Sequence, residues 1–370
     1  MNWFVVPARD FAHHAHRWQR LHAASPASPL LAVDFVQALL DVFGTGRELL
    51  AWHGQKDDDG DTHVMTIVAP GRAGVWNTFQ PAQAPVGLWL QRDTRPADAW
   101  LPGLLRALPG PALMVGLTQC DPVLMARPAL NTASGARSFD YIRTARVTLQ
   151  GSFDDYWNAR GKNLRNNLKK QRNRLRQDDI ATRLEIVRAS EDMAGAVADY
   201  GRLETGGWKA TEGTAVAADN DQGRFYRTML EALARRGAAS VYRYWFDGPG
   251  GPEVSRLAAM DLCIEGGGCI VILKTAYDEA LGPQLSPALL MREDATRGLF
   301  DEGRFERIEF YGRVMEWHTR WTDEIRTMYH LNGYRWPVLG RLHALAARRS
   351  GSDADVSAAP PAPAAAATGS

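Results

Sequence analysis

A short polar segment after an apolar run carries side chains that can hold an anion and move protons. Lys274, Tyr277 and Asp278 follow the run Cys269–Leu273, whose continuous apolar character favours a strand covered on both faces. An ammonium binds an anionic group, a carboxylate accepts a proton and a phenol donates one. A simpler interpretation is a surface ion pair between Lys274 and Asp278 at the end of the strand. The alternative interpretation places these three side chains at the acceptor side of a cleft.

Two further clusters carry functional groups: one could line an acceptor pocket and the other could supply a general base. Glu204, Trp208 and Lys209 place a carboxylate, an aromatic ring and a cation close together around two glycines. Glu316 and His318 lie in an aromatic-rich stretch, and an imidazole ordinarily titrates near neutral pH, as a general base requires. Each cluster also has a structural interpretation, with the tryptophan as a core anchor and the histidine as a packed surface residue.

A strongly basic segment opens the second half of the chain. Leu164, Leu168 and Leu175 share one helical face. Around them stand cations with no acid before Asp178: Arg160, Lys162, Arg165, Lys169, Lys170, Arg172, Arg174 and Arg176. The segment is either a solvated amphipathic helix or a cradle for a phosphate-rich partner, because clustered cations repel one another until an anion binds. Coenzyme A, a lipid-linked sugar diphosphate and tRNA are candidate partners, although the lack of interleaved aromatic residues disfavours single-stranded RNA.

The order of the expected elements places these residues on an α/β scaffold. Two helices precede three strands, of which Cys269–Leu273 is the third. Ser286 and Pro287 then mark a helix start, with serine as the cap and proline at the first helical position. A last strand is expected over Glu306–Tyr311. This order is compatible with one mixed central sheet.

Composition limits the function classes. The chain has 370 residues and a net charge of +1, so nothing draws the molecule as a whole toward DNA or an anionic membrane. The N-terminal apolar run Trp3–Val6 is too short for a signal peptide, and no stretch approaches a membrane span. No Cys/His spacing resembles a metal site. We therefore expect a protein without a metal, located in the cytoplasm or peripherally at the inner membrane face.

Length and shifts in composition predict two domains and a tail. We expect a first domain over residues 1–145 and a second over 146–345, which holds the clusters described above. Residues 350–370 are rich in Ala, Pro, Ser and Gly and have almost no large apolar side chains. This tail is expected to be disordered, because it cannot bury enough surface to offset its chain entropy.

Four segments of the second half together resemble a known family. They are KNLRNNLKKQRNRL from Lys162, ETGGWKATEGTA from Glu204, KTAYDEALGPQLSPALL from Lys274 and FYGRVMEWHTRW from Phe310. The chain resembles the GNAT superfamily, in the branch of acetyltransferase-like proteins associated with cellulose and exopolysaccharide synthesis. That branch is related to the Fem-type aminoacyl transferases. The resemblance implies an α/β fold of tandem GNAT-like lobes, the acyl-CoA N-acyltransferase fold, with a degenerate first lobe and the donor site in the second.

The resemblance also implies roles for single residues. Backbone N–H groups at the helix start bind the donor's pyrophosphate. The implied donor-site residues are Leu285, Ser286, Ala288 and Leu289, together with Arg165 and Lys169 of the basic segment. The implied catalytic residues are Lys274, Tyr277, Asp278, Glu204 and His318, and the implied acceptor pocket contains Trp208, Lys209 and Glu316. The family often has glycine where Ala288 stands and a Tyr-Lys pair where Trp317-His318 stands, so no lysine role is carried over to the second position.

The expected function follows from this resemblance. We expect acyl transfer from acyl-CoA, such as acetyl-CoA, which binds as a co-substrate, with no permanently bound cofactor. The expected acceptor is an amine or hydroxyl of a sugar or lipid-linked saccharide in surface polysaccharide synthesis, with polysaccharide-assembly proteins as partners. Two alternatives stay open: a Fem-like transferase that uses aminoacyl-tRNA, and a catalytically inactive GNAT-like scaffold.

Overall fold

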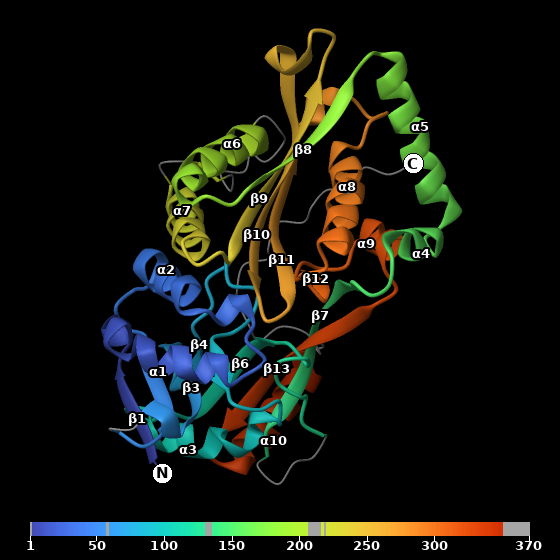
Figure 1. Cartoon of the computed structure of the whole chain (residues 1–370). Helices are drawn as coiled ribbons and strands as arrows, with labels where there is room; N and C mark the ends of the chain where they lie inside the picture. The colour runs from blue at the N-terminus through green and yellow to red at the C-terminus, as the bar shows by residue number, and fades with distance from the viewer. Residues whose placement is uncertain (1, 57–58, 130–134, 206–215, 218–219, 351–370) are drawn as a thin grey trace. The chain divides into compact units, whose positions relative to one another are not determined.

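The structure is a computed structural model (Figure 1), and it describes residues 2–56, 59–129, 135–205, 216–217 and 220–350. Trp208, Lys209 and the predicted tail beyond Ser350 lie outside the described residues. The chain divides into two compact units. One comprises the chain up to Thr144 and again from Arg326, and the other comprises Ala145–Ile325.

The C-terminal limit of the second unit differs from the predicted domain 146–345. β13 (Ile325–Tyr334) pairs antiparallel with β6 (Met114–Cys120), a strand of the first unit. The chain from Arg326 therefore groups with the first unit, because a strand stays with the sheet that satisfies its backbone hydrogen bonds.

The first unit is built on a mixed sheet. Its other strands are β1 (Asn2–Pro7), β2 (Leu49–Gly54), β3 (Thr62–Pro70), β4 (Val75–Thr78) and β5 (Trp89–Gln91). Their order is β1-β2-β3-β4-β6-β13, with β5 paired to β3. The β4–β6 pair is parallel and the others are antiparallel. The helices of this unit are α1 (Phe11–Ala23), α2 (Val33–Phe43), α3 (Leu101–Ala107) and α10 (Pro337–Ser350).

The second unit has its own run of strands. They are the end of β7 (Arg137–Thr148), β12 (Arg307–Phe310), β11 (Cys269–Tyr277), β10 (Ser255–Gly266), β9 (Ala239–Asp247) and β8 (Ala181–Val187), in that spatial order. The β11–β12 pair is parallel, whereas its neighbours are antiparallel.

Helices cover both faces of this second sheet (Figure 1). They are α4 (Phe153–Asn158), α5 (Lys162–Gln177), α6 (Met193–Thr205), α7 (Asp221–Ala234), α8 (Pro287–Glu302) and α9 (Glu316–Trp321). α6 and α7 lie on one face, and α8 with α5 lies on the other. Each polar side chain of the sheet therefore faces either α6 and α7 or α8 and α5.

The basic segment forms α5, and its predicted apolar stripe is confirmed. Leu164, Leu168 and Leu175 are all buried. Gln171 lies on the same stripe and is buried as well. A polar side chain in that position needs a hydrogen-bond partner, and Gln171 accepts a hydrogen bond from the N–H of Ser286, the residue before α8.

The predicted interior strand is also confirmed, because β11 lies between β10 and β12. α8 begins at Pro287, as the proline signal predicts, and its C-terminal cap, Gly303, adopts the left-handed conformation with a φ of 63°. Ser286 occupies the cap position, but its side chain makes no capping hydrogen bond. The predicted serine cap is wrong in that respect, and a different group serves this helix start.

Candidate functional site

A single extra residue interrupts the pairing of β11 with β10. Leu262 of β10 faces Lys274, whereas Cys263 faces Ile272, so Leu273 has no counterpart on β10. An extra residue of this kind is a β-bulge, which bends the strand. It also inverts the alternation of side chains between the two faces of the sheet.

The bulge decides which face carries each polar side chain of β11. Ile270 and Ile272 lie with residues of α8 on one face. Beyond the bulge, Thr275 accepts a hydrogen bond from Arg292 of α8, so the odd-numbered position now occupies that face. Lys274 is turned to the opposite face, toward α6. Without the bulge, its ammonium would point at α8.

β11 also leaves its parallel neighbour at this place. The two strands pair only where Cys269–Ile272 lies opposite Arg307–Phe310. β12 ends there, while β11 continues to Tyr277. In the described part of the chain, no strand covers this edge of β11 beyond the bulge. Backbone groups on an uncovered strand edge can pair with a bound molecule.

An ion pair joins α6 to β11 on the α6–α7 face. Lys274 Nζ lies 3.4 Å from Glu204 Oε1, and the two side chains are 17% and 2% exposed. Glu204 Oε2 accepts a hydrogen bond from the N–H of Val216 at 2.7 Å. Both residues belong to the predicted catalytic set, and the fold brings them together across 70 positions of sequence. The contact places a buried carboxylate beside an ammonium, an arrangement suited to proton transfer.

Two buried tyrosines complete this cluster, and sequence analysis missed both. Lys274 Nζ lies 5.7 Å from the centroid of the Tyr226 ring of α7, within the range of a cation–π contact. The Tyr200 hydroxyl donates to Glu204 Oε1 at 3.4 Å. Burial raises the pKa of both hydroxyls, and the charge of Glu204 adds to the effect, so both stay protonated. The four-residue spacing of Tyr200 and Glu204 on one helix was the available sequence signal.

The turn before α8 contains the predicted donor-site residues, and several of its N–H groups are already engaged. The N–H of Leu285 donates to the carbonyl of Gly282 at 3.3 Å. The N–H of Leu289 donates to the carbonyl of Ser286 at 2.9 Å. These bonds close the last loop and the first turn of the helix. They reduce the number of backbone donors that a ligand can use.

A side chain of α5 serves the same helix start. The N–H of Ser286 donates to Gln171 Oε1 at 2.8 Å, and Gln171 Nε2 donates in turn to Asn167 Oδ1 at 2.8 Å. Pro287 has no N–H. The N–H of Ala288 makes no hydrogen bond to another described residue. Of the predicted donor positions, Ala288 thus presents the backbone donor that is open to a ligand.

The segment that holds these residues matches a known protein family. Residues 162–319 match the family model of the acetyltransferase (GNAT) domain. The chain contains a GNAT-type acyltransferase domain. No curated protein matches the chain.

Two solved structures, FemX and a domain from Agrobacterium fabrum, share the fold of this chain. The chain is similar to FemX at 10% identity, with 92% of this chain and 99% of that chain covered and a TM-score of 0.54. It is similar to the C-terminal domain of a protein from Agrobacterium fabrum described as a lysylphosphatidylglycerol synthetase, at 13% identity, 91% and 97% coverage and a TM-score of 0.50. A tandem GNAT protein from the clavulanic acid biosynthesis pathway matches at 12% identity, 91% and 99% coverage and a TM-score of 0.45. The predicted fold class, a mixed α/β acyl-CoA N-acyltransferase fold, is confirmed.

In the GNAT domain, Tyr277 and Asp278 lie where β11 ends. Asp278 Oδ2 lies 2.5 Å from Arg256 Nε, and Asp278 Oδ1 accepts a hydrogen bond from the N–H of Ala280 at 2.9 Å. Lys274 pairs with Glu204, so the simpler interpretation of a Lys274–Asp278 surface pair is wrong. Partial burial and then the nearby Glu279 raise the pKa of Tyr277, which therefore keeps its proton at neutral pH.

His318 lies on the α8 side of the GNAT domain, apart from the Glu204–Lys274 pair. Its Nδ1 accepts a hydrogen bond from the N–H of Met315 at 2.9 Å, and its ring stacks on Trp317 with centroids 3.6 Å apart. Burial, followed by the charge of Arg292, lowers the pKa of His318 to about 4. The imidazole is thus uncharged at neutral pH, and it is a weaker base than an imidazole that titrates in its usual range.

Of three other predicted residues, Glu316 and Lys169 are exposed and Arg165 is half-buried. Glu316, with a side chain that is 74% exposed, pairs with Arg320 at 2.6 Å one helical turn away. Arg165 Nε donates to the carbonyl of Arg160 at 3.2 Å. The side chain of Lys169 is exposed on α5. These contacts are local, and they leave the predicted roles as proposals.

One cation of the basic segment is turned inward. Arg172 Nη2 lies 2.8 Å from Glu293 Oε2 and 2.6 Å from Asp294 Oδ1, both on α8. The Tyr244 hydroxyl donates to Asp294 Oδ2 at 2.6 Å. Arg172 therefore fastens α5 to α8. The cations of α5 that face solvent are Lys162, Lys169, Lys170, Arg174 and Arg176.

Trp208 and Lys209, the predicted acceptor-pocket residues, lie outside the described residues. Among the residues that are described, no group of three or more His, Cys, Asp or Glu side chains is arranged to hold a metal ion. No helix in the same part of the chain has the length and apolar character needed to cross a membrane.

Proposed function

We propose that the GNAT domain transfers an acyl group from acyl-CoA to an amine or hydroxyl of a sugar or lipid-linked saccharide. The observation that carries this proposal is the Glu204–Lys274 pair, held beside the bulge where β11 leaves β12. The pair puts a proton acceptor and a cation next to the strand edge that a bound donor can use. The surface-polysaccharide pathway rests on the family resemblance alone.

The chemistry needs three events, and the site has a candidate group for each. The nucleophile loses a proton, the thioester oxygen gains negative charge, and the thiolate leaves and takes up a proton. In this proposal Glu204 accepts the proton of the amine or hydroxyl, and the ammonium of Lys274 stabilises the oxyanion. The new C–N or C–O bond forms as the C–S bond breaks. Tyr277, which keeps its proton at neutral pH, is the proposed proton donor to the thiolate.

The start of α8 is the proposed donor site. The N–H of Ala288 makes no bond to another described residue, and it lies in the first turn of a 16-residue helix. The N-terminal end of such a helix carries a partial positive charge that favours the pyrophosphate of acyl-CoA. Leu285, Ser286 and Leu289 shape the turn, and Arg165 and Lys169 of α5 are proposed to contact the donor's phosphates.

The remaining expectations stay within this proposal. Trp208, Lys209 and Glu316 are proposed to line the acceptor side, and Asp278 and His318 to be secondary acid–base residues. Acyl-CoA serves as a co-substrate, with no permanently bound cofactor. The reaction is proposed to take place in the cytoplasm or at the inner membrane face, beside polysaccharide-assembly proteins.

A second candidate function uses aminoacyl-tRNA as the donor. The observation in its favour is the solvent-facing set of α5 cations, which includes Lys162, Lys169 and Lys170. Such a surface would neutralise phosphates and make binding strongly dependent on salt. A third candidate, an inactive scaffold, predicts that neither donor binds.

One experiment separates the three functions. The melting temperature of the full chain is measured with coenzyme A, acetyl-CoA, longer acyl-CoAs and bulk tRNA, because a ligand that binds the folded state raises it by mass action. We expect a rise with acyl-CoA compounds and none with tRNA at about 150 mM salt. A rise with tRNA alone would favour the second candidate. An unchanged melting temperature with every compound would favour the third candidate, the inactive scaffold.

A further inference from the structure

A buried ion pair lies on the α8 face of the domain, separate from the Glu204–Lys274 pair. Arg292 Nη1 lies 2.7 Å from Asp261 Oδ2, and the two side chains are 5% and 2% exposed. Arg292 Nη2 donates to Asp261 Oδ1 at 3.1 Å and to Thr275 Oγ1 at 3.2 Å. The Thr275 hydroxyl donates to Asp261 Oδ1 at 2.5 Å. Side chains from α8, β10 and β11 thus form a closed hydrogen-bonded set.

The guanidinium of Arg292 touches both strands at the place where they separate. Thr275 lies on β11 just beyond the bulge at Leu273. On the other side, Arg292 Cζ lies 5.3 Å from the ring centroid of Phe310, the last residue of β12. The ring of His318 meets the same phenylalanine edge-on, at 5.5 Å. One side chain therefore connects α8 with the diverging ends of β11 and β12.

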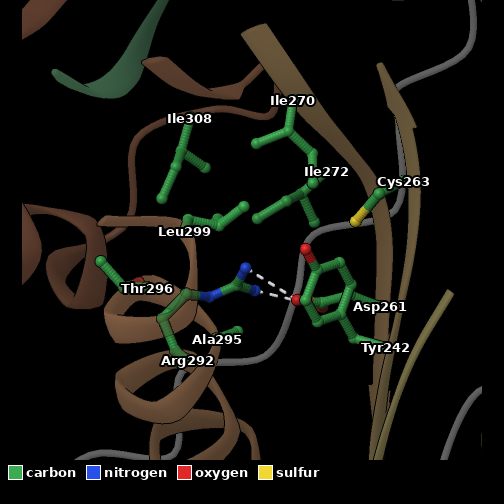
Figure 2. A pocket seen from close by; sticks show the side chains of 10 residues that line it. All are labelled: Tyr242, Asp261, Cys263, Ile270, Ile272, Arg292, Ala295, Thr296, Leu299 and Ile308. Atoms are coloured by element: carbon green, nitrogen blue, oxygen red, sulfur yellow. Dashed lines mark hydrogen bonds and ion pairs between the residues drawn. The ribbon is translucent and has the colours of Figure 1, made fainter. Parts of the chain in front are cut away.

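Apolar side chains predominate around the pair, with Tyr242 and Thr296 also among its neighbours. Figure 2 shows Arg292 reaching from α8 to Asp261 beside a small cavity. Other walls of the cavity include Ile270, Ile272 and Leu299. A carboxylate in such a place is costly to bury unless it is fully paired, and here Arg292 and Thr275 supply the donors.

Stability alone gives a poor explanation for this pair. Removing two charges from water costs about as much free energy as their attraction returns, so a buried pair adds little over packed apolar side chains. A planar guanidinium that bonds both oxygens of a carboxylate instead fixes direction and distance. Because Arg292 lies on α8 and is also bonded to Thr275, the pair fixes the position of α8 relative to the last residues of β11.

We propose that Asp261 and Arg292 are positioning residues that set the separation of β11 and β12 and thereby preorganise the acyl-donor site. The inference rests on the proposed function, because the donor is taken to bind where the strands part and at the first turn of α8. A ligand that finds its site already formed does not have to order it on binding. The Glu204–Lys274 pair lies on the opposite face of the sheet, so Arg292 acts on it only through the backbone of β11.

The test compares acetyl-CoA binding and turnover in matched variants of the full chain. Arg292→Met and the double variant Asp261→Asn/Arg292→Met are expected to raise the Kd for acetyl-CoA about tenfold or more, and kcat at saturating donor should fall by a smaller factor than the Kd rises. Arg292→Lys keeps the charge but not the planar fork, so it should give an intermediate Kd. Arg297→Met is the control, because Arg297 lies on α8 but forms an exposed pair with Asp154.

The double variant protects the test against misfolding. Arg292→Met alone leaves the buried carboxylate of Asp261 without its cation, whereas the double variant removes both charges. Circular dichroism verifies the fold of the double variant. Hydrogen exchange without ligand provides a second readout: amides of β11 beyond Leu273 should lose protection in the double variant and keep it in Arg297→Met. An unchanged Kd and unchanged exchange in the folded double variant would overturn the positioning role. Wild-type protein that binds no acetyl-CoA would instead overturn the proposed function. Hydrogen exchange would still show whether Asp261 and Arg292 hold the end of β11 in place.

Discussion

At the scale of single residues, the candidate site depends on Leu273. Glu204 and Lys274 each carry recognisable chemistry in the sequence, but their pairing requires the bulge that turns Lys274 toward α6. The run Cys269–Leu273 is continuously apolar, so it contains no alternation from which the face of Lys274 could be predicted. Asp261 was missed for a related reason, because it lies inside a strand whose neighbours are apolar.

Lys274→Met tests the pair directly. The change removes the ammonium while retaining an unbranched side chain, so turnover should fall by about a hundredfold or more. The Kd for acetyl-CoA should change less than about twofold, since the proposed donor site lies at the start of α8 and does not include Lys274. Steady-state kinetics and calorimetry measure the two quantities. Arg224→Met, in an exposed pair on α7, is the matched control. If turnover of Lys274→Met equals that of the control, Lys274 has no role in the chemistry.

The lowered pKa of His318 predicts that the free energy of unfolding falls at acidic pH. The folded-state pKa is about 4, below the ordinary value of 6.5, because burial and Arg292 disfavour the charged ring. The unfolded chain therefore takes up the proton first as the pH falls, so this contribution to stability is complete above about pH 6.5 and is lost progressively down to about pH 4. The loss amounts to about 3 kcal/mol at pH 4.

Denaturant unfolding between pH 7.5 and pH 4 measures this contribution. His318→Asn can still accept a hydrogen bond from the N–H of Met315 and has no titrating ring. Its free energy of unfolding should therefore fall less steeply over this range than that of the wild type. Equal slopes for the two proteins would show that His318 is not held uncharged by its surroundings.

At the scale of elements, local sequence signals predicted what depends on one segment alone. The leucine stripe placed the buried face of α5, and the proline placed the start of α8 at Pro287. The cap of α8 could not be predicted in this way. Gln171 reaches Ser286 from 115 positions away, and only the packing of α5 against α8 brings the two groups together. Contacts between elements are set by tertiary packing, which local propensity does not encode.

Ala288→Glu tests α8 as the donor site. The new side chain adds volume and negative charge beside the open N–H, so the Kd for acetyl-CoA should rise tenfold or more, equivalent to about 1.4 kcal/mol. The fold should persist, because a glutamate in the first turn of a helix suits the helix dipole. Calorimetry gives the Kd, and thermal unfolding verifies the fold. Ala288→Gln, similar in size but neutral, separates the effect of charge from that of volume. An unchanged Kd in folded Ala288→Glu would remove the donor from this turn.

At the scale of the whole molecule, the first unit is built from two separate segments of the chain, and the composition does not show where the second segment begins. The sequence around Arg326 shows no linker, and the chain there leaves one unit as β13 and pairs with β6 of the other. The partner of β13 lies about two hundred positions earlier, as in the pairing of Tyr329 with Cys120. A boundary set by long-range strand pairing leaves no local mark in the sequence, so the predicted domain 146–345 extends beyond the unit Ala145–Ile325.

Deletion of residues 351–370 tests how much of the chain the fold needs. This segment contains one large apolar side chain, Val356, among Ala, Pro, Ser and Gly residues. It therefore has little to contribute to any core, and its loss should shift the melting temperature by less than about 2 °C. The Kd for acetyl-CoA should stay within about twofold, because every residue assigned to the donor site lies between Arg165 and Leu289. A fall of about 5 °C or more would mean that this segment packs against the rest of the chain. A weaker Kd at an unchanged melting temperature would instead bring the segment into the donor site.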